Sequence, residues 1–332
     1  NPDILFRDYL YVSGTSNTAR EYFKWFADFV RNYVDGDLKI LDIASNDGSQ
    51  LDVFKKENFQ TFGIDPAANL CSLSSKNHTI CCDFLNEDSI DSFNTNFDVI
   101  IAQNVFAHNS YPMKFLYLCM NKLNKGGHIF IQTSQSEMIK NNEFDTIYHE
   151  HISFFSVKSF CFLARAVGLN VIDIKRSNIH GTSFIFVLSN EGIDKSDYFI
   201  SKEPELNISV INNYSRNCLR IAKDTFNKVN KIKQEGYKLI GYGAAAKGNT
   251  FINFSGINLD YIVDDNPLKH DLYTPGSKIK INPPLYLKEE KVKSCIIPLA
   301  WNFFPEIKEK VNKMKIRDHI FLKYFPTISI VK

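Results

Sequence analysis

Two histidines and a glutamate stand close together in the stretch "YHEHISFF", residues 148–155. Histidine has an ordinary pKa near neutrality, so such a set could remove a proton from a substrate. Two other interpretations are open. His149 and His151 could be half of a metal site, although a closed zinc site needs four ligands and the sequence has no C-x-x-C pair. Alternatively, the aromatic residues could make this a buried strand whose histidines are merely hydrogen-bonded.

A second stretch, "LDIASNDGSQL", occupies the place of a nucleotide-binding loop between an expected strand and an expected helix. Asp42 ends the strand, and Ala44, Asn46 and Gly48 stand where such loops usually carry G-x-G-x-G. Small residues still allow a ligand to approach the backbone, and asparagine tolerates left-handed dihedrals. Alone, the pattern is also that of an ordinary strand–turn–helix connection.

Acidic residues follow the next two expected strands. Asp65 in "FGIDPAANL" could bind both hydroxyls of a cofactor ribose. Asp83 and Phe84 in "CCDFLNED" could hydrogen-bond the exocyclic amine of adenine and cover its face. Each acid alone is more often a strand-end cap. Together the three strand ends favour S-adenosylmethionine over a nicotinamide cofactor, which the missing glycines disfavour.

The back half contains "GYGAAAKG", which fits G-x-G-x-x-A after a strand and before a helix, with Asp264 ending the next strand. Read alone, this loop, which includes Gly243, indicates a nicotinamide dinucleotide. Lys247 and Asn249 follow at the helix start, however, where backbone N–H groups and an ammonium together suit a diphosphate.

The elements that must hold these residues form an α/β fold in two parts. Short β-rich runs ("LKILDIA", "QTFGID", "FDVIIAQ", "GHIFIQT") alternate with helical stretches, the pattern of a parallel sheet with helices on both faces. The pattern restarts with "YKLIGYG", "LDYIVDD" and "KSCIIPLAW". We expect an N-terminal segment and helix at 1–36, a first domain at 37–193, a helical connector at 194–235 and a smaller domain at 236–332.

Composition narrows the class of partner. A chain of 332 residues with 44% hydrophobic composition and a formal charge of +2 suggests a globular protein that binds small molecules rather than nucleic acid. No apolar run is long enough to span a bilayer, so no membrane partner is expected. An odd number of cysteines argues against a disulfide framework and favours the cytoplasm. A monomer is plausible, but the sequence does not determine the oligomeric state.

The motifs together resemble the sugar-nucleotide methyltransferases related to the enzymes that C-methylate 4-keto deoxysugars, over nearly the whole chain. The similar stretches are "DYLYVSGTS", "LDIASNDGSQL", "NVFAHN", "DTIYHEHISFFS", "IHGTSF", "GYGAAAKGNTFINFSGI" and "VDDNPLKHDLYTPGSKI". That family usually begins with a cysteine-rich zinc module, and this chain starts about where the module would end. We therefore expect a truncated chain and predict no metal site.

The resemblance implies a class I S-adenosylmethionine methyltransferase domain followed by a second, smaller Rossmann-like domain that helps to hold the nucleotide sugar. The cofactor residues that it implies are Asp42, Ala44, Asn46, Gly48, Asp65, Pro66, Asp83, Phe84, Gln103 and Asn104. The substrate residues that it implies are Tyr11, His180, Gly243, Lys247, Asn249 and Asp264.

The resemblance also gives the catalytic residues. His151 matches the base, Glu150 and Tyr148 match residues around the sugar, and His108 is placed near the transferring methyl group. His149 is expected to be structural. The expected acceptor is a carbon beside a ketone of a nucleotide-activated sugar or, as an alternative, a sugar hydroxyl. More distant alternatives are a nicotinamide-dependent sugar-nucleotide oxidoreductase and a non-catalytic binding protein. Departures from the family pattern at Asn109, Thr182 and Phe184 warn of an unusual acceptor.

Overall fold

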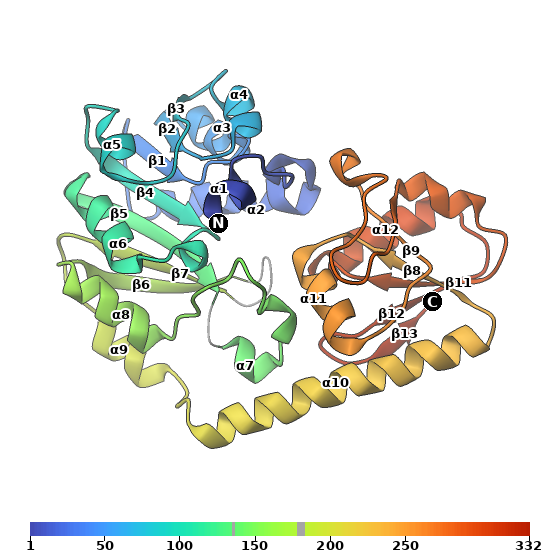
Figure 1. Cartoon of the computed structure of the whole chain (residues 1–332). Coiled ribbons are helices and arrows are strands. Elements are labelled where there is room, and N and C mark those ends of the chain that lie inside the picture. Colours follow the sequence, from blue (N-terminus) through green and yellow to red (C-terminus); the bar gives the residue numbers. More distant parts are fainter. Residues whose placement is uncertain (135–136, 178–182) are drawn as a thin grey trace. The chain divides into compact units, whose positions relative to one another are not determined.

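The computed structural model describes residues 1–134, 137–177 and 183–332, which form two compact units (Figure 1). Unit 1 comprises Asn1–Glu137 and Ile152–Pro204, and unit 2 comprises Met138–His151 and Glu205–Lys332. The segment with the "YHEH" motif therefore packs with unit 2, although the predicted bounds placed it inside a first domain at 37–193. The other predicted bounds stay predictions.

Unit 1 is built on a sheet with the strand order β3-β2-β1-β4-β5-β7-β6 (Figure 1). Its strands are β1 (Lys39–Ile43), β2 (Gln60–Ile64), β3 (Thr79–Cys81), β4 (Phe97–Gln103), β5 (Leu123–Ser134), β6 (Asn170–Ser177) and β7 (Ser183–Ser189). The four strands predicted for the front half are confirmed. These four strands pair in parallel as expected, and the further strand β7 runs antiparallel to both β5 and β6.

Helices cover both faces of this sheet. They are α1 (Pro2–Phe6), α2 (Asn17–Arg31), α3 (Ser49–Lys56), α4 (Ala68–Ser74), α5 (Glu87–Asp91), α6 (Pro112–Asn121), α8 (Val157–Ala166) and α9 (Ser196–Lys202). Successive strand residues point to opposite faces, so Ile40 packs with α2 and α3 while Leu41 packs with α6 and α8. Burial on both faces explains why the strands read as continuous apolar runs.

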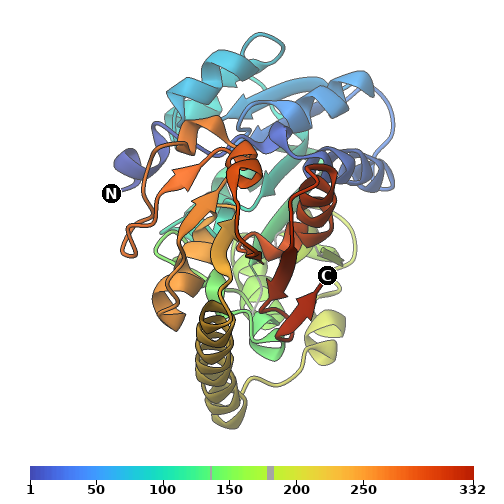
Figure 2. The same cartoon turned by 90° about the vertical axis from the view of Figure 1, so that its right-hand side faces the viewer.

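Unit 2, whose strands can also be followed in Figure 2, has a sheet with the order β10-β9-β8-β11-β12-β13. Its strands are β8 (Lys238–Tyr242), β9 (Tyr261–Val263), β10 (Ile281–Asn282), β11 (Ser294–Pro298), β12 (His319–Lys323) and β13 (Ser329–Val331). The predicted strands at β8, β9 and β11 are confirmed, and β13 adds an antiparallel edge.

The helices of unit 2 again lie on two faces. They are α7 (Met138–Asn141), α10 (Ile208–Gln234), α11 (Ala246–Ser255) and α12 (Phe304–Lys313). The predicted helical connector becomes α9 and the long, amphipathic α10. Buried residues of α10 and α11 pack on one face of the sheet, and those of α12 pack on the other. Throughout the described part of the chain, no helix is both long and apolar enough to cross a membrane.

Phe144 explains why the segment Met138–His151 belongs to unit 2. Its side chain is 6% exposed, and its ring lies 4.8 Å from that of Phe254, 5.5 Å from that of Phe325 and 5.9 Å from that of Phe251, measured between centroids. Aromatic pairs at such distances contribute about 0.5–1.5 kcal/mol each beyond the buried area. The motif residues that follow are thereby fixed to unit 2.

Candidate active site

The loop after β1 has the backbone that a nucleotide site requires. Ala44, Asn46 and Gly48 all adopt positive φ angles, of 65°, 52° and 80°. These are the positions at which such loops usually carry glycine, and asparagine tolerates this region better than most residues. The loop therefore has a left-handed backbone at all three positions, even though two of the usual three glycines are replaced.

We expect Gly48→Ala to lower the free energy of unfolding by roughly 2 kcal/mol or more, because strain at positive φ and a steric contact act together. A Cβ at Gly48 would lie 2.9 Å from Cδ2 of His78 and 3.0 Å from Cβ of Ser74. Gly36→Ala is the matched control, since Gly36 has a φ of 93° but nothing within 4 Å of the added Cβ. Denaturant unfolding compares the two variants, and equal losses would contradict the steric contribution.

Asp65 joins the turns that follow β1 and β2. Its carboxylate is buried, and its two oxygens accept hydrogen bonds from the backbone N–H groups of Asn46 and Ala67, each at 2.8 Å. In the chain, Pro66 separates Asp65 from Ala67. Burial raises the pKa of Asp65, and these two hydrogen bonds partly oppose the rise. Each oxygen keeps a second lone pair, so the carboxylate can still accept hydroxyl groups.

Asp42 is buried within β1, close to Asp65. Burial and then the charge of Asp65 raise the pKa of Asp42 well above its ordinary value. Asp42 therefore keeps its proton more readily than a solvated carboxyl group, and a protonated carboxyl can donate as well as accept a hydrogen bond.

Asp83 and Phe84 lie together after β3, and Arg7 contacts both of them. The Arg7 guanidinium donates to Asp83 at 3.0 Å, and its carbon lies 4.9 Å from the centroid of the Phe84 ring. Burial would raise the pKa of Asp83, but hydrogen bonds from the Phe84 backbone, Asn86 and Arg7 lower it overall. The sequence analysis missed Arg7, because nothing in its local pattern indicates a partner 76 positions away.

The segment of residues 7–15, here called the strap, crosses the edge of the sheet at which Asp65 and Asp83 lie. Asn46 donates to the backbone carbonyl of Tyr11 at 3.0 Å and accepts from the Ser13 backbone at 2.9 Å. Tyr9 and Asn69 exchange two further hydrogen bonds. The strap therefore brings the Tyr11 backbone next to the predicted cofactor loop, and the substrate role of Tyr11 stays a prediction.

The end of β4 contributes three more predicted residues. Gln103 donates to Gln50 at 3.4 Å, and Asn104 has a φ of 56°. His108 ends the 3₁₀ turn Phe106–His108 and is half-buried, with Phe6 edge-on to its ring at 5.8 Å. Burial lowers the pKa of His108 to about 4, despite a hydrogen bond to the Asn104 backbone, so its imidazole is neutral at pH 7 and is a weak base.

His151 is held in one tautomer by its neighbours in unit 2. Its Nδ1 lies 2.9 Å from the carbonyl oxygen of Thr146, which can only accept, so Nδ1 carries the proton of the neutral ring. Its Nε2 lies 3.0 Å from the hydroxyl of Tyr148 and accepts that O–H. The basic lone pair is therefore at Nε2. A general base has this arrangement, with one nitrogen oriented by an acceptor and the basic lone pair on the other, which here accepts the Tyr148 hydroxyl.

The two other residues of the motif differ in exposure. Burial raises the pKa of Glu150, and the charge of His149 opposes the rise. The side chain of His149 is 71% exposed, with Nε2 3.8 Å from the Glu150 carboxylate. Within residues 1–134, 137–177 and 183–332, no three His, Cys, Asp or Glu side chains gather as a metal site would require.

The predicted phosphate loop follows β8. Gly243 has a φ of 92°, and a Cβ there would lie 2.9 Å from that of Ala300. The Lys247 ammonium lies 5.6 Å from the centroid of the Trp301 ring, and Asn249 accepts from Asn253 at 3.2 Å.

Asp264 repeats in unit 2 the arrangement of Asp65 in unit 1. Its two oxygens accept the backbone N–H groups of Ala244, at 2.6 Å, and of Asn266, at 2.8 Å. One difference is the Lys269 ammonium, which lies 3.5 Å from the carboxylate. Asp65 after β2 therefore fixes the turn that follows β1, and Asp264 after β9 fixes the turn that follows β8.

The predicted residues fall into two groups. Unit 1 brings together the cofactor residues with Tyr11 and His108, whereas unit 2 carries Tyr148, Glu150 and His151 with the phosphate loop. His180 and Thr182 lie outside the described residues.

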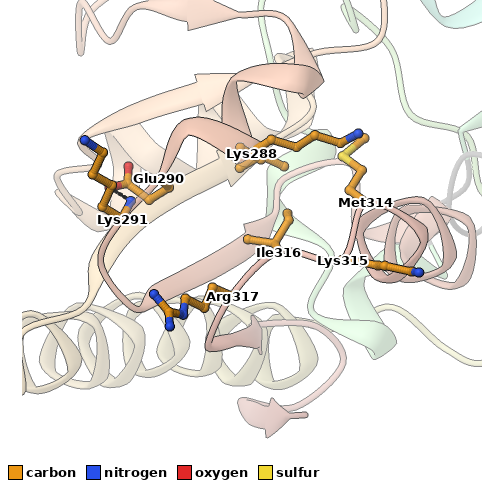
Figure 3. A pocket seen from close by; sticks show the side chains of 8 residues that line it. Lys288, Glu290, Lys291, Met314, Lys315, Ile316 and Arg317 are labelled. Carbon is orange, nitrogen blue, oxygen red and sulfur yellow. Dashed lines mark hydrogen bonds between the residues drawn. The ribbon is translucent and has the colours of Figure 1, made fainter.

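A cavity of about 510 Å³ lies elsewhere on unit 2 (Figure 3). Its lining comes from the segments that precede β11 and β12 and comprises Leu287, Lys288, Glu290, Lys291, Met314, Lys315, Ile316 and Arg317. Ligands of open α/β sheets bind outside the carboxyl ends of the strands, whereas this cavity lies at the amino ends. It contains none of the predicted site residues.

Comparison with known proteins gives consistent matches. Residues 15–174 match the model of a methyltransferase domain, and residues 178–326 match that of a C-methyltransferase C-terminal domain. The C-methyltransferase NovU of Streptomyces niveus is 28% identical over 325 residues, which cover 92% of this chain and 77% of NovU. The G-x-G-x-x-A loop lies within the residues that match the C-methyltransferase C-terminal domain.

The solved structures that resemble this chain align with about half of its residues. An S-adenosylmethionine-dependent methyltransferase of Clostridium acetobutylicum is 12% identical, with a TM-score of 0.41, over 54% of this chain and 94% of its own. A protein of Pyrococcus horikoshii is 14% identical, with a TM-score of 0.44, over 55% and 95%.

Proposed function

Because the chain belongs to a family of S-adenosylmethionine-dependent C-methyltransferases, we propose that it methylates a carbon beside the ketone of a nucleotide-activated sugar. The observation that carries this proposal is the hydrogen bonding of His151, which presents a basic nitrogen next to a phenol. S-adenosylmethionine, the cofactor, supplies an electrophilic methyl group when it is bound.

The residues of unit 1 fit that cofactor. The left-handed loop at Ala44, Asn46 and Gly48 keeps side chains away from the space above the strand ends. Asp65 has lone pairs for ribose hydroxyls, and Asp83 with Phe84 offers an acceptor and an aromatic face for adenine. These assignments rest on the geometry of unit 1 alone.

His151 is the better of the two candidate bases. A carbon beside a ketone becomes nucleophilic when it loses a proton, and an efficient base has a pKa near the working pH. The pKa of His108, lowered to about 4, makes it too weak for that step. We therefore assign proton removal to Nε2 of His151, with the Thr146 carbonyl orienting the ring.

Tyr148 and Glu150 surround the base. The Tyr148 hydroxyl occupies the Nε2 lone pair, so it must either move aside for the substrate or relay the proton to Nε2. The raised pKa of Glu150 means that it holds a proton more readily than a solvated carboxyl group. In its protonated form it can donate a hydrogen bond to a sugar oxygen on which negative charge develops.

The diphosphate of the substrate is assigned to the loop after β8. The start of α11 points backbone N–H groups out of the helix, and Lys247 adds a positive charge. Gly243 suits this loop because its φ of 92° and the nearby Ala300 leave no room for a side chain.

We expect Lys247→Ala to raise the Michaelis constant for the nucleotide sugar by about 10-fold or more while leaving the affinity for S-adenosylmethionine unchanged, since a charge-assisted hydrogen bond contributes roughly 1.5–3 kcal/mol. Steady-state kinetics and calorimetry provide the two values. Lys293→Ala is the control, because Lys293 also lies over an aromatic ring, that of Tyr237, but precedes β11. A loss of donor affinity instead would reverse the assignment of the two sites.

The experiment that tests the function has two steps. A mass-spectrometric screen of nucleotide sugars with S-adenosylmethionine identifies the acceptor, and NMR of the product locates the new methyl group. Incubation of that acceptor in D2O with S-adenosylhomocysteine should then exchange the proton beside the ketone. A methyl group that resonates as an ether, formed on a sugar without a ketone, would overturn the carbon acceptor and leave His151 as the base for a hydroxyl.

A further inference from the structure

Asp145 is a buried carboxylate in the segment that carries the motif. It lies in the 3₁₀ turn Phe144–Thr146, and its side chain is 0% exposed. One carboxylate oxygen accepts the indole N–H of Trp301 at 2.6 Å, although the two residues are 156 positions apart. A buried charge is costly unless it is paired, so its retention here calls for a role.

The charges around Asp145 come from several elements of unit 2. Burial raises its pKa to about 6, the Lys247 ammonium and the Trp301 hydrogen bond oppose the rise, and the charge of Glu143 adds to it. Its own charge acts on Tyr214 and Cys218 of α10 and on Tyr324 after β12. Lys247 is the cation among these groups.

Trp301 links Asp145 to the phosphate loop. The edge of its indole donates to Asp145, and the Lys247 ammonium lies over its ring, 5.6 Å from the centroid. A cation over a tryptophan face is attracted by the ring quadrupole, and this attraction fixes both groups. Asp145 therefore acts on Lys247 twice, through its charge and through the indole that it orients.

Asp145 is also the residue that precedes Thr146 in the chain. The Thr146 carbonyl accepts from Nδ1 of His151, which sets the tautomer and the direction of Nε2. A shift of Asp145 would therefore shift the group that orients the base.

We propose that Asp145 is a positioning residue that couples the diphosphate-binding end of unit 2 to the orientation of His151. It holds Trp301 and Lys247 on one side and, through Thr146, the base on the other. The roles of Lys247 and His151 in this proposal rest on the proposed function, whereas the contact between Asp145 and Trp301 does not.

The first test uses the fluorescence of Trp301. The sequence contains two tryptophans, so Trp25→Phe leaves Trp301 as the sole reporter. Its emission should change with an inflection near pH 6 as Asp145 gains a proton, and Asp145→Asn should abolish that inflection. Glu143→Gln is the matched control, because loss of its charge should move the inflection to lower pH without removing it. An inflection that persists unchanged in Asp145→Asn would overturn the contact.

The second test follows the segment itself by hydrogen exchange. Asp145→Ala should increase amide exchange in residues 138–151, whereas Asp145→Asn, which keeps an acceptor for Trp301, should restore protection. With the acceptor found in the screen, Asp145→Ala should lower turnover by about 10- to 100-fold at unchanged S-adenosylmethionine affinity, since small misplacements of a catalytic group cost that much. Unchanged exchange and turnover in Asp145→Ala would overturn the positioning role.

These arms separate two kinds of failure. Fluorescence and hydrogen exchange need neither donor nor acceptor, so their outcome is independent of the reaction. If both behave as expected while no nucleotide sugar is methylated, the proposed function fails and the contact stands. If methylation occurs but Asp145→Ala is as active as the wild type, the function stands and the positioning role fails.

Discussion

Replacement of His151 by asparagine is expected to lower the turnover number for methyl transfer by on the order of 10²- to 10⁴-fold, the usual contribution of a general base. Asparagine can still donate a hydrogen bond to the Thr146 carbonyl, but it offers no basic nitrogen in place of Nε2. The same variant should abolish exchange of the acceptor proton in D2O, because that exchange needs the base but no methyl transfer.

His149→Asn provides the matched control. This neighbour is also a histidine, but its side chain is 71% exposed, so its replacement should leave turnover within about 3-fold of the wild type. Calorimetry with S-adenosylmethionine should give the same affinity for both variants, since neither residue belongs to unit 1. A His151→Asn enzyme that retains more than a tenth of wild-type turnover would show that another group removes the proton.

Much of the fold was readable because its signals are local. Apolar runs that end in an acid, such as the one before Asp65, predicted parallel strands buried on both faces. Asn46 and Gly48 are residue types that tolerate left-handed dihedrals, and both have positive φ angles in the loop. The antiparallel pair β6 and β7 was not predicted, since Asp173, Lys175 and Arg176 interrupt β6 with polar side chains.

Long-range contacts account for what the sequence did not reveal. The "YHEH" motif follows the last parallel strand of unit 1, and nothing in its spacing shows that Phe144 packs against helix α11 of unit 2. The sequence analysis gave Asp145 no role, because its partner Trp301 is remote in the chain. The roles of the site residues stay predictions, for geometry alone does not test chemistry.

Asp65→Ala is expected to weaken the binding of S-adenosylmethionine by about 10- to 150-fold, because it removes charge-assisted hydrogen bonds to the ribose that contribute on the order of 1.5–3 kcal/mol. The loss has a second source in this structure, since the same carboxylate holds the backbone of Asn46 and Ala67 in place. Calorimetry measures the affinity, and thermal unfolding of the cofactor-free protein measures how much stability is lost with the two backbone hydrogen bonds.

Two further variants separate these sources. Asp65→Asn keeps one carbonyl oxygen for a backbone N–H but loses the charge, so a ribose role predicts a loss of affinity that exceeds any loss of stability. Asp264→Asn changes the equivalent carboxylate of unit 2, which makes the same pair of backbone hydrogen bonds, and should leave donor affinity intact. If Asp65→Asn binds the cofactor as the wild type does, Asp65 serves the loop alone, and the ribose must be held by other groups at the edge of the sheet.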